Sequence, residues 1–62
     1  MPEIIVGDII LLRMGGAYEV TDIKDLLIYS YELRFNIKDV SEVWRKRENS
    51  GIYELIYHRN FV

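Results

Sequence analysis

Alternation of apolar and polar side chains, broken at turn-forming residues, predicts a protein built from β-strands. The longest alternating run covers residues 26–35, and its odd-numbered positions are all large and apolar: Leu27, Tyr29, Tyr31, Leu33 and Phe35. Successive side chains of a strand point to opposite faces, so we expect one half-buried strand with these residues inward. A helix capped at Thr21 or Asp22 is the alternative, but Ser30 would break its apolar stripe.

Two earlier runs predict a hairpin. Residues 8–13 form a short, branched, apolar run that is typical of a strand buried on both faces. Gly15 and Gly16 then supply the backbone freedom for a tight reversal, and residues 17–23 alternate as a second strand. Lys24 and Asp25 indicate the next turn.

The last third of the chain predicts a second hairpin, with strands on either side of a turn at residues 48–51. Before it, Ile37 and Val40 lie three positions apart in residues 36–41, which is typical of a single helical or 3₁₀ turn. Because the chain has few other large side chains, we expect Trp44 and some of the tyrosines to be needed in the core.

Together these elements predict one all-β domain over residues 1–62: a small five-stranded antiparallel SH3-like barrel, with one short helical turn before the last hairpin. A five-stranded antiparallel sheet or an open OB-like barrel is the nearest alternative.

Residues 6–16, Val-Gly-Asp-Ile-Ile-Leu-Leu-Arg-Met-Gly-Gly, carry a family resemblance. They resemble the opening of small bacterial SH3-like proteins with the pattern Val-Gly-Asp-x-Val-x-Leu-Lys-x-Gly-Gly-Pro, although Ala17 stands where the pattern has proline. That family is largely uncharacterised, so the resemblance implies a fold and no activity. The short, tyrosine-rich chain also resembles small proteins encoded by phages and prophages.

Composition adds an expectation of self-association. Half of the 62 residues are apolar, which is more than so small a domain can hide from water. The chain has no cysteine, no signal-peptide pattern at its N-terminus and no apolar run long enough to cross a bilayer, so we expect a cytoplasmic protein without membrane contact.

Candidate chemistry is sparse. His58 is the only histidine, and no spacing of histidines and carboxylates predicts a metal site. The serines lack a nucleophile motif, and the glycine pair lacks the spacing of a phosphate-binding loop. We therefore expect no enzyme activity, no metal and no cofactor.

The residues best suited to touch a partner gather in the C-terminal hairpin: Trp44, Arg45, Arg47, Tyr53, Tyr57, His58 and Arg59. Aromatic and arginine side chains are enriched at protein interfaces, so we expect a protein-interaction module that binds a protein partner or its own copy. The Arg45→Glu and Tyr57→Ala variants should then weaken association and leave folding intact.

Nucleic-acid binding by the same hairpin is the alternative function, because small barrels stack bases on aromatic side chains beside basic grooves. Residues 44–62 carry four basic and two acidic side chains, a net charge of +2, whereas residues 1–43 carry four basic and eight acidic ones, a net charge of −4. The overall charge of −2 favours the protein partner.

Overall fold

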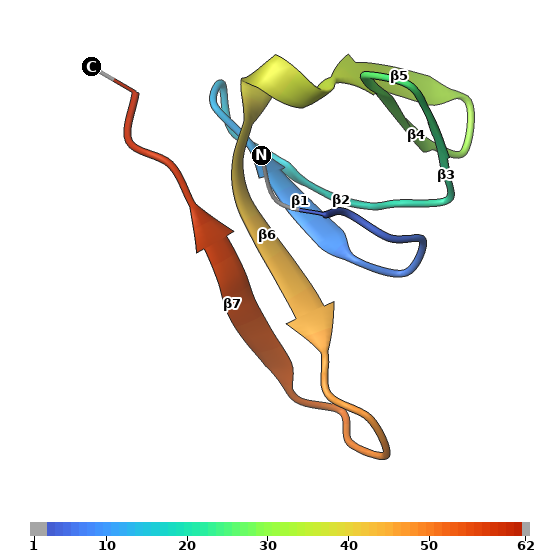
Figure 1. The fold of residues 1–62 in the computed structure, drawn as a ribbon, viewed down its shortest axis with the longest axis vertical. Helices are drawn as coiled ribbons and strands as arrows, with labels where there is room; N and C mark the ends of the chain where they lie inside the picture. Colours follow the sequence, from blue (N-terminus) through green and yellow to red (C-terminus); the bar gives the residue numbers. More distant parts are fainter. Residues whose placement is uncertain (1–2, 62) are drawn as a thin grey trace.

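The computed structural model describes residues 3–61 as two antiparallel β-sheets and one turn of 3₁₀ helix (Figure 1). In chain order the elements are β1 (Ile9–Leu12), β2 (Ala17–Glu19), β3 (Asp22–Lys24), β4 (Leu27–Ser30), β5 (Leu33–Asn36), the 3₁₀ helix η1 (Ile37–Asp39), β6 (Val40–Lys46) and β7 (Tyr53–His58). The all-β prediction is confirmed, but the described chain has seven strands in place of five, and they do not close into a barrel.

The first sheet has the strand order β2-β1-β6-β7, and the second has the order β3-β4-β5. The chain crosses from one sheet to the other between two consecutive residues. The Val20 N–H donates to the Asp8 carbonyl at 2.8 Å, beside β1, whereas the Thr21 N–H donates to the Tyr29 carbonyl at 2.8 Å, in β4. The single strand predicted over residues 17–23 is therefore divided into β2 and β3, which belong to different sheets.

The core between the sheets is aliphatic. Its buried side chains are Ile4, Ile10, Leu12, Val20, Ile28, Val40 and Val43. Tyr18, Phe35 and Tyr57 pack against its border, and the rings of Tyr18 and Phe35 lie 4.6 Å apart, but none of the three is fully buried. The expectation that Trp44 would fill the core is wrong, because Trp44 is only half-buried and lies on the other side of β6 from Val43.

The prediction of one strand over residues 26–35 is also wrong. This segment is a hairpin in which β4 pairs with β5, with Ile28 opposite Phe35 and Ser30 opposite Leu33. On β4 the inward face is also reversed, because Ile28 and Ser30 are buried, whereas Tyr31 and Leu33 further along the segment are exposed. Of the residues expected inward, Phe35 on β5 does pack against the core. Helix, the alternative reading, is not formed here.

Tertiary hydrogen bonds explain this unexpected turn. Tyr31 has a φ of 57°, a left-handed backbone conformation that is rare for a bulky residue. The Tyr31 N–H donates to Thr21 Oγ1 at 2.8 Å, and the Tyr31 hydroxyl donates to Glu19 Oε1 at 3.2 Å. Both partners lie on the segment that crosses between the sheets, so the turn depends on contacts that local sequence does not show.

The predicted terminal hairpins and the predicted helical turn are confirmed. β1 and β2 form a hairpin through Gly15 and Gly16, whose φ angles are 105° and 92°. The predicted helical turn is η1, where Asn36 Oδ1 accepts a hydrogen bond from the Lys38 N–H at 2.9 Å. β6 and β7 then form the last hairpin.

Candidate functional site

The C-terminal hairpin is the most extended part of the molecule. It contains six of the seven partner residues predicted from the sequence, and the seventh, Arg59, directly follows β7. Its turn is closed by a hydrogen bond from the Arg47 N–H to the Ile52 carbonyl at 2.8 Å, and Ser50 Oγ accepts from the Ile52 N–H at 3.0 Å. β7 lies at the edge of its sheet, and the turn end extends beyond the rest of the ribbon (Figure 1). Each side chain of this hairpin therefore lies either on the inner face of the sheet, toward the core, or on the outer face, away from it.

Strand register divides the predicted residues between these faces. On β6, Val43 pairs with Ile10 and both are fully buried, which defines the inner face of the four-stranded sheet. Trp44 pairs with Ile9 on one side and Leu55 on the other, and these three side chains point outward. Trp44, Tyr53 and His58 thus belong to the outer face, whereas the others belong to the inner face or follow β7: Arg45, Arg47, Tyr57 and Arg59.

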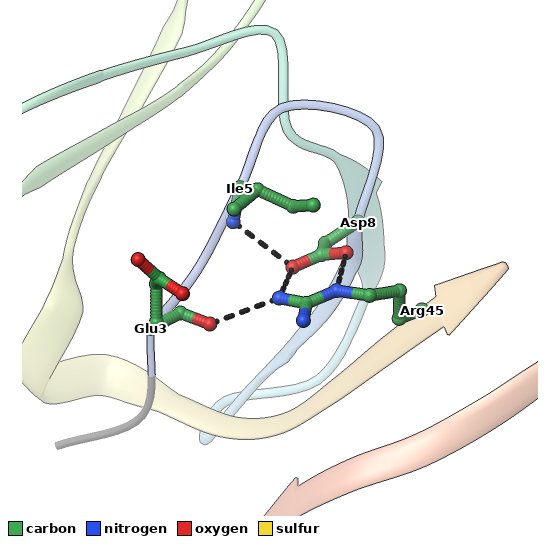
Figure 2. Close-up of polar contacts among 4 residues, drawn as sticks. All are labelled: Glu3, Ile5, Asp8 and Arg45. Carbon is green, nitrogen blue, oxygen red and sulfur yellow. Dashed lines mark hydrogen bonds and ion pairs between the residues drawn. The ribbon is translucent and has the colours of Figure 1, made fainter.

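Arg45 is held on the inner side by Asp8 (Figure 2). Its Nε and Nη2 atoms donate to the two oxygens of the Asp8 carboxylate, each at 2.9 Å, and Nη2 also donates to the Glu3 carbonyl at 3.0 Å. Asp8 is 1 % exposed, and its Oδ2 also accepts from the Ile5 N–H at 3.0 Å. A two-pronged contact of this kind fixes both groups in direction, so it ties the segment before β1 to β6.

This ion pair also shifts the pKa of Arg45. The hydrogen bond to Asp8 raises the pKa of the guanidinium; desolvation opposes the rise, and the negative charges of Asp8 and Glu3 add to it. A raised pKa of a basic group gives stability that is lost only when pH rises through the folded-state value. Arginine is already charged in the unfolded chain at ordinary pH, so the contribution of Arg45 to stability stays constant there.

Three other predicted residues also have partners within the chain. Arg47 Nε lies 3.1 Å from Glu54 Oε1, in a pair that is more than half exposed. Tyr57 packs against the core opposite Val43. The Arg59 guanidinium lies 4.7 Å from the centre of the Phe61 ring, and its Nη1 donates to the Lys38 carbonyl at 3.4 Å. Tyr57 and Arg59 therefore hold the C-terminal hairpin to the rest of the molecule, whereas Arg47 joins its two arms.

The outer face is different. Trp44 Nε1 donates to Glu42 Oε1 at 2.9 Å, and His58 Nε2 lies 3.8 Å from Glu42 Oε2, so these three side chains share one surface. Register places five apolar side chains on that surface, which we call the outer face: Ile9, Leu11, Trp44, Tyr53 and Leu55. Tyr53 and Leu55 are 40 % and 45 % exposed, and the other three are half-buried.

Sequence reasoning missed three apolar members of this surface. Ile9 and Leu11 lie in a run of four apolar residues that predicted burial on both faces, whereas only Ile10 and Leu12 are buried. Leu55 lies two residues after Tyr53 on β7, so the sequence pattern already placed the two on one face. Only the aromatic residue was predicted to touch a partner. Two further exposed apolar side chains, Ile52 and Ile56, also lie on this arm of the hairpin.

Within residues 3–61, no group of three or more histidine, cysteine, aspartate and glutamate side chains could hold a metal ion. The hollows are open ones: one lies inside the turn over residues 46–51, and the other is lined by Ile5, Val6, Gly7, Asp8, Arg45 and Lys46. No helix in the described part of the chain is long and apolar enough to cross a membrane.

Comparison with protein-family models, with curated proteins and with solved structures found no match.

Proposed function

We propose that this protein is a non-catalytic interaction module, which binds a protein partner or its own copy through the outer face. The observation that carries this proposal is the composition of that face: four apolar side chains lie around the chain's single tryptophan, on the side of the sheet turned away from the core. Apolar side chains that the core does not use mark contact surfaces when they are contiguous, and tryptophan and tyrosine are enriched at the centres of such surfaces.

Charge supports a protein partner over a nucleic acid. Arg45 is bound to Asp8 and Arg47 lies beside Glu54, so the two arginines of the predicted basic strand are already neutralised. On the outer face itself, Lys46 shares the surface with Glu42 and Glu19. A surface of mixed sign releases few counterions from phosphates, which lowers its affinity for nucleic acid.

The same proposal extends to the fold. If β2 and β3 are counted as one bent strand, the order of β1, β2/β3, β4, β5, η1 and β6 matches the layout of an SH3-like barrel, with β7 as an added edge strand. Nuclear Overhauser contacts should then run without a break along this bent strand, from Val20 beside Asp8 to Thr21 beside Tyr29. Two independent strands with a mobile link between them would contradict it.

The functional proposal is tested with Trp44→Ala and, as its control, Leu26→Ala, which removes an exposed apolar side chain from the turn between β3 and β4. We expect the wild type and the control to self-associate in ultracentrifugation or to capture a host protein by affinity, and Trp44→Ala to lose that contact. A strictly monomeric wild type that captures no protein contradicts the proposal. Tight binding of an oligonucleotide at low salt, weakened by Lys46→Ala, would support the nucleic-acid alternative instead.

A further inference from the structure

The outer face of β6 has a charge pattern that is opposite at its two ends. Glu42, Trp44 and Lys46 are spaced two residues apart and therefore share this face. The rise of a strand places each charged residue roughly 7 Å from the tryptophan, one on either side. The acidic end is well ordered, because Glu42 accepts from the Trp44 indole and lies beside His58.

Such a pattern is complementary to itself. Consider two copies with their outer faces stacked, and a two-fold axis midway between the sheets. If this axis is perpendicular to β6 and passes over Trp44, the β6 strands of the two copies are antiparallel. This operation places Glu42 over Lys46 of the second copy and Lys46 over its Glu42, while Trp44 meets Trp44. By the same operation His58 faces Tyr53 of the second copy, because these residues lie beside Glu42 and Lys46 on β7. An axis parallel to the strand would instead place Glu42 over Glu42.

We propose, on the basis of the proposed function, that the partner of the outer face is a second copy of this chain. The two four-stranded sheets pack face to face with antiparallel β6 strands, as in a β-sandwich with its sheets about 10 Å apart. Both halves of the contact are the same patch, which is the usual arrangement of a two-fold dimer. A partner charged with one sign would leave either Glu42 or Lys46 facing a like charge.

The contact is centred on β6 and β7. Glu19 also belongs to the outer face, but it lies on the edge strand β2, where the same axis brings it toward its own copy. It lies in the same row as Ile9 and Trp44, exposed at the edge of the sheet, and the Tyr31 hydroxyl already donates to it at 3.2 Å. Glu19 therefore lies at the rim of the interface and weakens it slightly.

The area of the outer face sets the expected affinity of the dimer. Four strands about 4.8 Å apart, which have three to seven residues and five on average, on a rise of about 3.3 Å, make a face roughly 15–20 Å on a side. Such a face is at or below the lower end of specific interfaces, so we expect a dissociation constant on the order of 100 µM. The dimer should also weaken as salt is raised, since its charged pairs are at the rim.

Charge reversal and mixing give the test. In sedimentation velocity at high micromolar concentration, Glu42→Lys and Lys46→Glu should each weaken self-association by about tenfold, because each variant places like charges opposite each other at both ends. An equimolar mixture of the two variants should associate again, because every facing pair is then of opposite sign. Glu32→Lys and Arg34→Glu make the same charge changes on exposed residues of the β4–β5 hairpin and should leave association unchanged.

Glu42→Gln is the control for loss of folding. It removes the negative charge, but its amide oxygen can still accept the hydrogen bond from the Trp44 indole. It should retain the wild-type circular dichroism and associate a few-fold more weakly. The dimer is overturned if the mixture of the two reversed variants stays monomeric while both are folded, or if the two control variants disrupt association equally. It is also overturned if the wild type is monomeric at high micromolar concentration but captures a host protein through Trp44, an outcome that upholds the proposed function. If neither association nor capture occurs, both proposals fail.

Discussion

The inner and outer faces of the β6–β7 hairpin contain similar side chains in very different surroundings. Arg45 and Lys46 are adjacent in sequence, yet Arg45 donates two hydrogen bonds to the buried Asp8 carboxylate, whereas Lys46 is exposed on the other face. Tyr57 borders the core, whereas Tyr53 is exposed. The comparison shows that one residue type serves the fold or remains available to a partner according to the face on which it lies. Arg45 and Lys46 are on opposite faces by simple alternation. Tyr53 and Tyr57 would share a face by alternation, but the register shift beside Val43 and Trp44 places them on opposite faces.

The comparison revises two mutational expectations. Arg45→Glu places a carboxylate against the buried Asp8, and Tyr57→Ala removes packing from the border of the core. Both changes act on folding before they act on any contact surface. Variants that separate association from stability therefore have to come from the outer face.

The largest effect should come from breaking the inner face at Asp8. Asp8→Ala leaves the Arg45 guanidinium and the Ile5 N–H without their acceptor, which should lower the free energy of unfolding by about 3 kcal/mol. Urea unfolding followed by circular dichroism measures this. Lys46→Ala is the control on the opposite face and should change the same quantity by less than about 0.5 kcal/mol; equal effects of the two variants would remove the distinction between the faces.

The next effect separates two aromatic residues of the hairpin. Trp44→Ala should weaken association by about 2 kcal/mol, as truncation of an interface centre does, with a smaller loss of stability. Tyr57→Ala should do the reverse and lower the free energy of unfolding by about 2 kcal/mol through lost packing. Sedimentation measures association and thermal unfolding measures stability for both variants. If Trp44→Ala lowered stability more than association, and Tyr57→Ala did the reverse, the assignment of the two residues to faces would be contradicted.

A smaller effect tests the turn that sequence reasoning missed. Thr21→Val keeps the shape of the side chain but removes the oxygen that accepts from the Tyr31 N–H, so it should cost about 1 kcal/mol of stability. Thr21→Ser retains the hydroxyl and should cost less than half as much. If the valine and serine variants have equal stability, the turn at Tyr31 does not depend on this hydrogen bond.

The smallest effect concerns an exposed ion pair. Arg47→Ala removes a contact to Glu54 in which both side chains are more than half exposed, so the change in unfolding free energy should stay below about 0.5 kcal/mol. Raising the salt concentration should reduce it further. A loss comparable to that of Asp8→Ala would show that exposure does not distinguish the two arginines.

Local pattern was enough to predict both terminal hairpins and the 3₁₀ turn, because glycine, asparagine and hydrophobic spacing mark them in the sequence. It was not enough for residues 26–35. Tyr31 and Glu32 form a turn without any turn-forming residue, and the hydrogen bonds that stabilise it come from Glu19 and Thr21 on another strand. An extended reading across such a turn also assigns the wrong face to the core.

The candidate site shows the same division. Alternation within β6 places Trp44 and Lys46 together, but the sequence does not show that Ile9 lies beside Trp44 or that Asp8 takes Arg45 out of the contact surface, 37 residues away. These contacts follow from the pairing of β1 with β6, which only the fold supplies. Predicted binding residues on a strand should therefore be assigned to faces before they are combined into one surface.

The contact surface itself can be mapped most directly by amide and indole chemical shifts recorded on dilution. Trp44 is the only tryptophan, so its indole N–H gives a single, well-resolved signal at the centre of the outer face. We predict that this signal and the amides of Ile9 and Leu55 shift with protein concentration, while those of Leu27 and Leu33 on the second sheet do not. Shifts confined to the second sheet, with a constant Trp44 indole signal, would contradict the account.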